Sequence, residues 1–211
     1  MDSGMEQMDP RRRVAREAAR LIYTGAAEEY KQAKEEAARS LGVKAMPSNY
    51  EVAVELDHRA EEAEGEERRR LLLKLRHVAL KIMRILREFN PLLVGSVWRG
   101  TARKGSDVDI SLYASRPDEV VARLRAADLS IKDIEEMVVT KTGQPKRSHH
   151  ISVVLEDGDE AEVVVRPPEE KGEVERCEIY GDPKKGLSLT ELEKLMRVDP
   201  LRKFVPQRRR R

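Results

Sequence analysis

Hydrophobic residues in the first ninety positions recur with helical spacing, and after residue 91 the spacing becomes that of strands. The first periodic stretch spans residues 9–41 and opens with Asp9 followed by proline, which is typical of a helix start. Gly25 interrupts this stretch, and Gly42 is expected to end it. The pattern therefore predicts helices separated by a short break.

A second helical stretch follows. Ser48 and Glu51 have the spacing of a capping box and predict its start. The acidic run at 61–67 contains Gly65, which predicts a kink or a loop there. From Arg68 a broad apolar stripe continues to residue 89, where Asn-Pro ends the helix.

Short apolar or alternating runs in the second half of the chain predict strands. They cover residues 92–94, 108–113, 136–142, 149–155 and 160–166, with a further candidate near 174–180. Residues 156–159 predict a hairpin turn. Ser115 with Asp118, and Ser188 with Glu191, are expected to cap two helices. The predicted class is α+β, with a helical N-terminal region followed by a mixed β-sheet flanked by helices.

The change of period also suggests how the chain is organised. We expect a helical region at 1–89, a strand-containing core at 90–185, and a C-terminal helix with a basic tail at 186–211.

Composition narrows the picture only slightly. The chain has 41 basic and 39 acidic residues, so its net charge of +2 neither favours nor excludes a nucleic-acid partner. Cys177 is the one cysteine, which excludes a disulfide framework and a thiolate metal site. No apolar run is long enough for a membrane span, and no signal peptide is recognisable, so a cytoplasmic protein is expected.

The most informative chemistry lies in residues 93–110. Asp107 and Asp109 are two positions apart on a predicted strand, so both carboxylates point to one face, about 6–7 Å apart. Carboxylates this close repel each other unless a cation lies between them. Oxygen ligands at this spacing suit Mg²⁺ together with substrate phosphates.

The residues before this pair complete a phosphate-binding pattern. Gly95 and Ser96 follow a predicted strand and precede a short helix, where Gly allows close backbone approach and Ser offers a hydroxyl. Arg99 and Lys104 add positive charge, and Ser106 directly precedes the aspartate pair. Phosphoryl or nucleotidyl transfer is the reaction class that uses such groups.

This string of residues resembles the polymerase β-like nucleotidyltransferases, and it is similar to both the minimal members and the archaeal CCA-adding enzymes. The resemblance rests on Gly95-Ser96, on Arg99-Gly100-Thr101 and on Ser106-Asp107-Val108-Asp109-Ile110. It implies a nucleotide site formed by Gly95, Ser96, Arg99, Lys104 and Ser106. It also implies two Mg²⁺ ions, with Mn²⁺ as an alternative ion, and ATP or another NTP as substrate.

The family uses a third carboxylate on a later strand, and Glu162 is the candidate by resemblance. Glu160 lies on the same predicted face, so the choice between the two glutamates stays open. The family often has Asp here, and Glu is one methylene longer. By resemblance, the catalytic and metal-binding residues are Asp107, Asp109 and Glu162.

Several neighbouring residues allow two interpretations. His149 and His150 face opposite sides of a strand, so at most one can reach the site, and ordinary polar strand positions are favoured. Trp98 can stack on a base or pack on the long helix, and packing is favoured. The run Arg208–Arg211 can be a solvated, disordered tail or an RNA contact, and the solvated tail is favoured.

The leading hypothesis is an enzyme that transfers a nucleoside monophosphate from an NTP to an acceptor hydroxyl, with an RNA 3′ end as one acceptor. A protein side chain or a small alcohol is an alternative acceptor. The chain is too short for the tRNA-measuring domains of the CCA-adding enzymes. An antitoxin-like or nucleotide-binding module with little catalysis is the competing hypothesis, and the pattern does not indicate an oligomeric state.

Overall fold

The computed structural model describes residues 9–141, 144–155 and 158–207. The chain divides into two compact units. The first unit comprises the described residues up to Arg68 together with Arg176–Pro183, and the second comprises Arg69–Glu175 and the residues from Lys184 onward. This division does not coincide with the predicted boundary at residue 89. None of the helices in the described part of the chain is long and apolar enough to cross a membrane.

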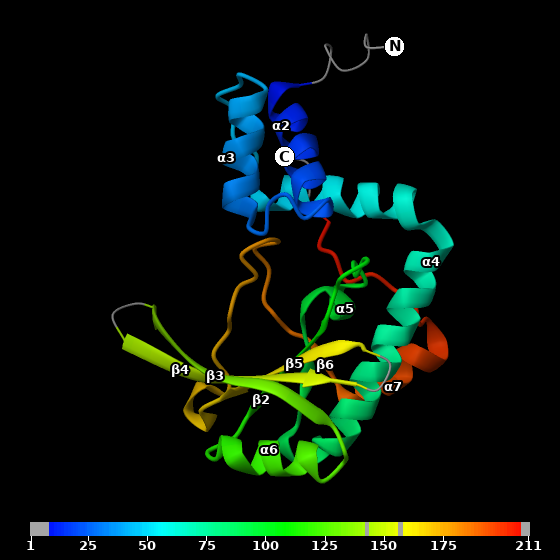
Figure 1. Cartoon of the computed structure of the whole chain (residues 1–211), viewed down its shortest axis with the longest axis vertical. Coiled ribbons are helices and arrows are strands. Elements are labelled where there is room, and N and C mark those ends of the chain that lie inside the picture. Colours follow the sequence, from blue (N-terminus) through cyan, green and yellow to red (C-terminus); the bar gives the residue numbers. More distant parts are fainter. Residues whose placement is uncertain (1–8, 142–143, 156–157, 208–211) are drawn as a thin grey trace. The chain divides into compact units, whose positions relative to one another are not determined.

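The first unit is helical. It contains α2 (Pro10–Tyr23), α3 (Tyr30–Ser40) and the first part of α4 (Asn49–Ile85) (Figure 1). Small and branched side chains of α2 and α3 form its core, and Val52 of α4 completes it. The capping box predicted at the start of α4 is present, because Ser48 N donates to Glu51 Oε2 at 2.7 Å and Glu51 N donates to Ser48 Oγ at 3.3 Å.

Helix α4 is interrupted at Gly65, where φ is 51° and ψ is −120°. This backbone conformation is outside the helical region, and glycine adopts it at low cost because it has no Cβ. The predicted kink in the acidic run is therefore confirmed.

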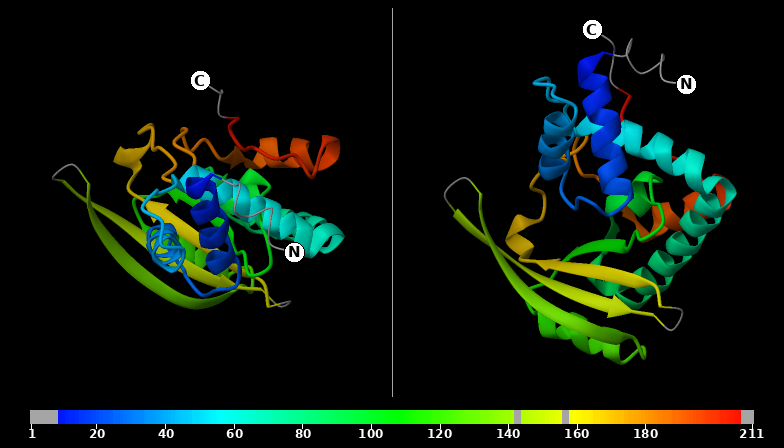
Figure 2. Two further views of the ribbon diagram at one scale, coloured as in Figure 1. Left: turned by 90° about the horizontal axis from the view of Figure 1, so that it is seen from above. Right: turned by 45° about the horizontal axis from the view of Figure 1, so that its top comes forward.

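The second unit is built on a six-stranded mixed sheet with strand order β3-β4-β5-β2-β1-β6. The strands are β1 (Leu92–Leu93), β2 (Val108–Tyr113), β3 (Ser130–Lys141), β4 (Gln144–Val154), β5 (Glu160–Arg166) and β6 (Leu187–Ser188). Only β2 and β5 pair in parallel, and the other neighbours are antiparallel. The β3–β4 hairpin extends past the end of β5, which pairs with β4 only from His149 to Val154 (Figure 2).

Helices complete this unit. They are α5 (Gly95–Arg99), α6 (Pro117–Arg125), α7 (Leu189–Val198) and the second part of α4, with 3₁₀ turns at Arg87–Phe89 and Pro168–Glu170. Leu112 of β2, Val163 of β5 and Leu124 of α6 are fully buried in one core that also includes α4 side chains. In Figure 1, α6 covers one face of the sheet. The alternate positions of β2 and β5, which include Asp109 and Glu162, point to the other face.

Most of the predicted elements are found. Strands β2 and β5 match the predicted ranges, and α7 begins with the predicted capping box of Ser188 and Glu191. The α+β class is also confirmed. The predicted turn at 156–159 lies partly outside the described residues, and so does the run Arg208–Arg211.

Three local predictions were wrong. Helix α6 begins at Pro117 with Arg116 at its N-cap and no side-chain cap, so Ser115 and Asp118 do not form a capping box. Proline fixes its own φ and so favours the first helical position, which moves the start by one residue. Residues 174–180 are not a strand, and only an isolated bridge joins Arg176 to Pro183. Strands β3 and β4 begin six and five residues before their predicted starts, because their mutual pairing extends both through polar sequence.

Candidate active site

Gly95 meets Asp109 where β1 leads into α5. Val94 N donates to Asp109 O at 2.9 Å, which ties the end of β1 to β2. Gly95 has φ of 67°, and a Cβ at this position would be 1.8 Å from Asp109 Oδ2 and 2.6 Å from its Cγ. The glycine therefore makes room for the Asp109 carboxylate. Asp107 directly precedes β2 and is exposed.

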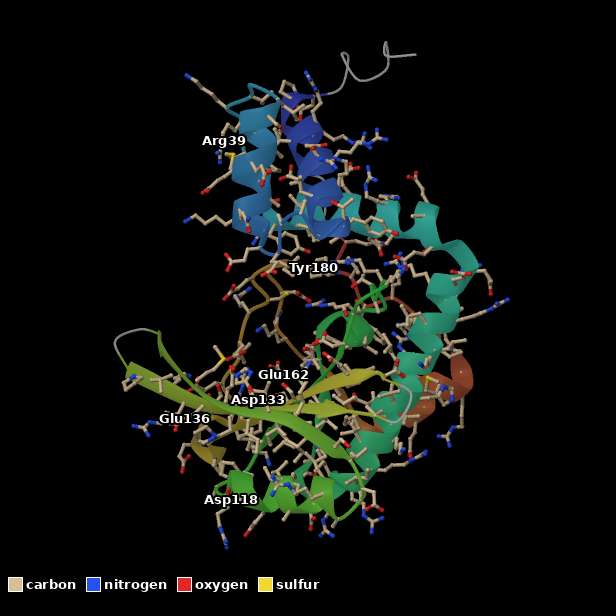
Figure 3. All side chains as sticks on the ribbon, in the orientation of Figure 1. Arg39, Asp118, Asp133, Glu136, Glu162 and Tyr180 are labelled. Carbon is tan, nitrogen blue, oxygen red and sulfur yellow. The ribbon has the colours of Figure 1, made fainter. Side chains whose placement is uncertain are left out.

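Glu162 lies beside Asp109. The two residues are register partners on the parallel strands β2 and β5, so their Cα atoms are about 4.8 Å apart and their side chains share a face. Glu162 is labelled in Figure 3 on the side of the sheet away from Asp118, which belongs to α6. The structure thus places Glu162 beside Asp109, and the charges of Asp107 and Glu162 both act on Asp109.

Glu160 shares the face of Glu162 but has a different environment. Its side chain is 58% exposed and pairs with Lys132 Nζ at 2.9 Å. Lys132 comes from the point where the β3–β4 register shifts between Ile131 and Asp133. Glu160 is thus drawn toward β3, whereas Glu162 is bound by a side chain of β4 and is the register partner of Asp109 on β2.

His150 is a neighbour of the site that sequence reasoning did not favour. Its Nδ1 is 2.9 Å from Glu162 Oε1, and its Nε2 is 3.1 Å from Ser148 Oγ. As predicted, His149 and His150 point to opposite faces, and His150 is the one on the carboxylate face. Only the pairing of β4 with β5 shows which histidine meets the site, so the alternation along one strand could not identify it.

Lys184 is a second neighbour that the sequence did not reveal. Its positive charge acts to lower the pKa of Asp109, and its Nζ lies 3.4 Å from Glu175 Oε2. Arg166 NH1 holds the same glutamate at 2.7 Å. These contacts place a cation on the carboxylate side of the sheet, although Lys184 is 75 residues from Asp109 in the chain.

The carboxylates perturb each other's protonation. Burial, followed by the charges of Asp107 and Glu162, raises the pKa of Asp109 to about 7. The pKa of Asp107 is also raised, first because the surrounding protein removes part of its hydration and then because of Glu162 and Glu160, although a backbone hydrogen bond opposes the shift. Such a cluster is stabilised by a bound cation.

This shift predicts how the stability of the metal-free protein depends on pH. The unfolded chain loses the Asp109 proton near pH 4, whereas the folded protein keeps it until about pH 7. The folded state binds more protons between these values, so the free energy of unfolding falls as pH rises through this range and levels off above it. Asp109→Asn removes the titrating group and should therefore abolish this decline. We expect the decline to amount to about 2 kcal/mol, a value reduced by the partial screening of the half-buried side chain by water.

Urea unfolding in EDTA at pH 5 to 8 measures the effect. The advantage of Asp109→Asn over the wild-type protein should grow with pH up to about 7. A constant difference between the two proteins across this range would contradict the assigned pKa.

Arg99, one of the predicted nucleotide-binding residues, lies in the protein interior. It is 4% exposed, its NH1 donates to Phe204 O at 2.8 Å, and its guanidinium lies 4.1 Å from the centre of the Trp98 ring. These contacts give Arg99 a structural role, so we leave it out of the proposed phosphate ligands. Trp98 is 6% exposed within the core, which agrees with packing rather than base stacking.

The other predicted nucleotide residues lie around α5 and the loop that follows it. Ser96 is in the first turn of α5, and Lys104 is exposed in the loop. Ser106 Oγ accepts from Arg103 N at 3.0 Å, so its hydroxyl closes the turn that leads to Asp107.

A buried arginine of α4 donates hydrogen bonds to carbonyls of helix α5. Arg76 is fully buried and donates to four carbonyls, those of Val97 and Trp98 in α5 and those of Pro200 and Arg202 in the C-terminal segment. Gly100 permits this arrangement, because a Cβ there would be 2.8 Å from Arg202 O. Phe204 N also donates to Arg99 O at 2.8 Å. The C-terminal end of α5, at residues 97–100, is therefore supported by contacts with Arg76 and with residues 200–204.

The donor set fits a hard divalent cation. Asp107, Asp109 and Glu162 offer oxygen ligands on one face, which suit a hard cation. The raised pKa values of Asp107 and Asp109 indicate that the surrounding protein only partly compensates the charges of these two carboxylates. Within the described residues, no three carboxylate, histidine or cysteine side chains are gathered closely enough to form a ready metal cluster.

Comparison with known families is consistent with this geometry. Residues 80–181 match the family described as "Nucleotidyltransferase domain". This segment contains β1, α5, the aspartate pair and β5, and it is a nucleotidyltransferase domain of the polymerase β-like type. A search of curated proteins found no match.

Solved structures show distant likenesses. A mutant of the Cid1 poly(U) polymerase bound to MgATP is 16% identical with a TM-score of 0.31, and the match covers 44% of this chain and 32% of that one. A cytoplasmic RNA terminal U-transferase is 16% identical with a TM-score of 0.32, and the match covers 56% of this chain and 34% of that one. The chain thus matches about a third of the length of these proteins.

Proposed function

We propose that this protein is a metal-dependent nucleotidyltransferase that moves a nucleoside monophosphate from an NTP to an acceptor hydroxyl. The observation that carries the proposal is the register pairing of Asp109 with Glu162, with Gly95 packed against Asp109. Together with Asp107 these residues would hold Mg²⁺, which would neutralise phosphate charge and lower the pKa of the acceptor hydroxyl.

The chain's own groups have separate roles in the proposed reaction. A carboxylate of the cluster accepts the hydroxyl proton, and the acceptor oxygen forms a bond to the α-phosphorus. The bond from this phosphorus to the bridging oxygen breaks, and pyrophosphate leaves with the electron pair. Gly95 and Ser96 bind the β- and γ-phosphates, while Lys104 and Lys184 offset the negative charge that develops on the leaving group.

An RNA 3′ end is the acceptor that we favour. The support is the cationic segment that follows α7, which contacts α5 through Arg76 and Arg99. Arg202 and Lys203 of this segment are exposed, and the run Arg208–Arg211 follows them in the sequence. Clustered arginine and lysine side chains bind nucleic-acid phosphates.

Two glutamate variants test the assignment of the third carboxylate. We expect Glu162→Gln to lower the transfer rate about a hundredfold or more, because it removes a metal-binding charge beside Asp109. Glu160→Gln is the matched control, since it makes the same chemical change on the same face of β5, and it should alter the rate less than about threefold. The assay follows label from each α-³²P NTP with Mg²⁺ into RNA, protein and small alcohols.

The outcomes separate the hypotheses. Label that enters RNA and depends on Glu162 would support the proposed activity and acceptor. Label that enters protein or a small alcohol would retain the enzyme and overturn the acceptor. Binding of Mg-NTP without transfer to any acceptor would favour the nucleotide-binding module.

A further inference from the structure

The side chain of Glu162 is held by a histidine from the neighbouring strand. His150 Nδ1 lies 2.9 Å from Glu162 Oε1, and Ser148 Oγ lies 3.1 Å from His150 Nε2. The three residues form a hydrogen-bonded row that runs from β4 to the carboxylate next to Asp109.

The strand register explains how they meet. On the antiparallel pair β4–β5, Ser152 is opposite Glu162 and His150 is opposite Val164. His150 is therefore diagonal to Glu162 on the same face, a separation of about 7–8 Å between Cα atoms that an imidazole can span. The side chains of His150 and Glu162 are 21% and 35% exposed, so the protein partly shields this contact from water.

Both ring nitrogens of His150 have a hydrogen-bond partner. An ionised carboxylate only accepts hydrogen bonds, so Nδ1 donates to the charged form of Glu162, whereas the Ser148 hydroxyl can donate to Nε2 or accept from it. The two contacts fix the orientation of the ring at both ends.

We propose that His150 is a positioning residue that orients the Glu162 carboxylate toward Asp109 for metal binding. This inference rests on the proposed function. With Oε1 held by His150, the rotation of the carboxylate is restricted, and Oε2 remains to bind the ion. Hydrogen-bond partners that orient a ligand typically change metal affinity about 10–100-fold when they are removed.

A comparison with the partner of Glu160 shows why the contact between His150 and Glu162 is specific. Lys132 is 61% exposed and has a flexible side chain, so its ion pair with Glu160 imposes little geometry. His150 has a planar ring with two defined hydrogen bonds. The two glutamates on this face of β5 therefore differ in how firmly they are held, and the firmly held one is opposite Asp109.

Mn²⁺ binding in the presence of ATP, followed by electron paramagnetic resonance, tests the proposal without relying on transfer. We expect His150→Leu to weaken Mn²⁺ binding about 10–100-fold. His150→Asn keeps an N–H group near the position of Nδ1 and should restore the affinity to within about threefold of the wild-type value. His149→Leu is the matched control, because it makes the same change at the adjacent residue on the opposite face, and it should leave the affinity unchanged.

Thermal unfolding of each variant in EDTA verifies that it is folded. Should His150→Leu fail to fold, Ser148→Ala provides a milder change and should weaken Mn²⁺ binding about threefold through the loosened ring. Wild-type affinity in folded His150→Leu, or in Ser148→Ala when that variant takes its place, would overturn the role of His150 while leaving the proposed function intact. Equal weakening by His150→Asn and His150→Leu would also overturn it. If the wild-type protein binds no Mn²⁺ with ATP, both the inference and the proposed function are wrong.

A double variant adds a second readout. If His150 acts through Glu162, then His150→Leu should cost little further Mn²⁺ affinity once Glu162→Gln is present. Additive losses would mean that His150 binds the ion or the nucleotide independently, which would contradict a positioning role.

Discussion

Replacing Asp109 by asparagine is expected to lower the rate of nucleotidyl transfer about a thousandfold or more, equivalent to at least about 4 kcal/mol of transition-state stabilisation. Asp109 lies between Gly95 and Glu162, so its carboxylate is at the centre of the proposed metal site. The amide is nearly the same size but carries no charge, and it removes repulsion from Asp107 and Glu162. The metal-free variant should therefore be at least as stable as the wild-type protein.

Steady-state transfer from labelled NTP and urea unfolding in EDTA measure the two effects. Asp133→Asn is the matched control, because Asp133 lies in the same cross-strand row, opposite Ser152 and two strands away from Glu162. It should keep nearly full activity. An Asp109→Asn protein that is inactive and also clearly destabilised in EDTA would indicate a structural role for this carboxylate.

Replacing Gly95 by alanine is expected to reduce the transfer rate about a hundredfold and to destabilise the fold by about 1–3 kcal/mol. The added Cβ would be 1.8 Å from Asp109 Oδ2 and 3.0 Å from its Cβ, so rotation of the carboxylate group alone cannot relieve the overlap. The positive φ of 67° adds backbone strain. The carboxylate must then leave the position opposite Glu162, and metal binding is lost with it.

Gly105→Ala separates the effect of backbone strain from the effect of the clash with Asp109. Gly105 has a similar φ of 80°, but a Cβ there would meet nothing within 4 Å. This variant should show the backbone cost without the loss of activity. In addition, the stability cost of Gly95→Ala should shrink in an Asp109→Ala background, because the clashing side chain is absent. Equal activity losses in Gly95→Ala and Gly105→Ala would show that strain, rather than contact with Asp109, determines the effect.

Local features of the fold could be predicted well from the sequence. The capping boxes at Ser48 and Ser188 depend on residues three apart, and strand β2 shows its alternation within six positions. The glycine at 65 likewise acts through its own backbone. The starts of β3 and β4 depended on the pairing of these two strands with each other, which neither strand's own pattern shows, and they were predicted wrongly.

In the site, too, some features follow from near neighbours in the sequence and others from strands that are distant in the sequence. That Asp107 and Asp109 share a face follows from the two-residue period of a strand, so the sequence alone determined this pair and its likeness to a nucleotidyltransferase domain. The position of Glu162 opposite Asp109 required the parallel register of β2 and β5, which joins residues more than fifty positions apart. The distinction from Glu160 came from Lys132 on a third strand.

Tertiary structure alone decided where the polar residues around the carboxylates lie and which groups they contact. Arg99 looked like a phosphate ligand because it is close to Gly95 in sequence, but a carbonyl of the C-terminal segment binds its guanidinium in the protein interior. His150 and Lys184 looked ordinary, and folding brings them to the carboxylate face. The physical reason is that alternation and capping depend on near neighbours, whereas the hydrogen-bond partner of a charged side chain depends on which distant strand folds against it.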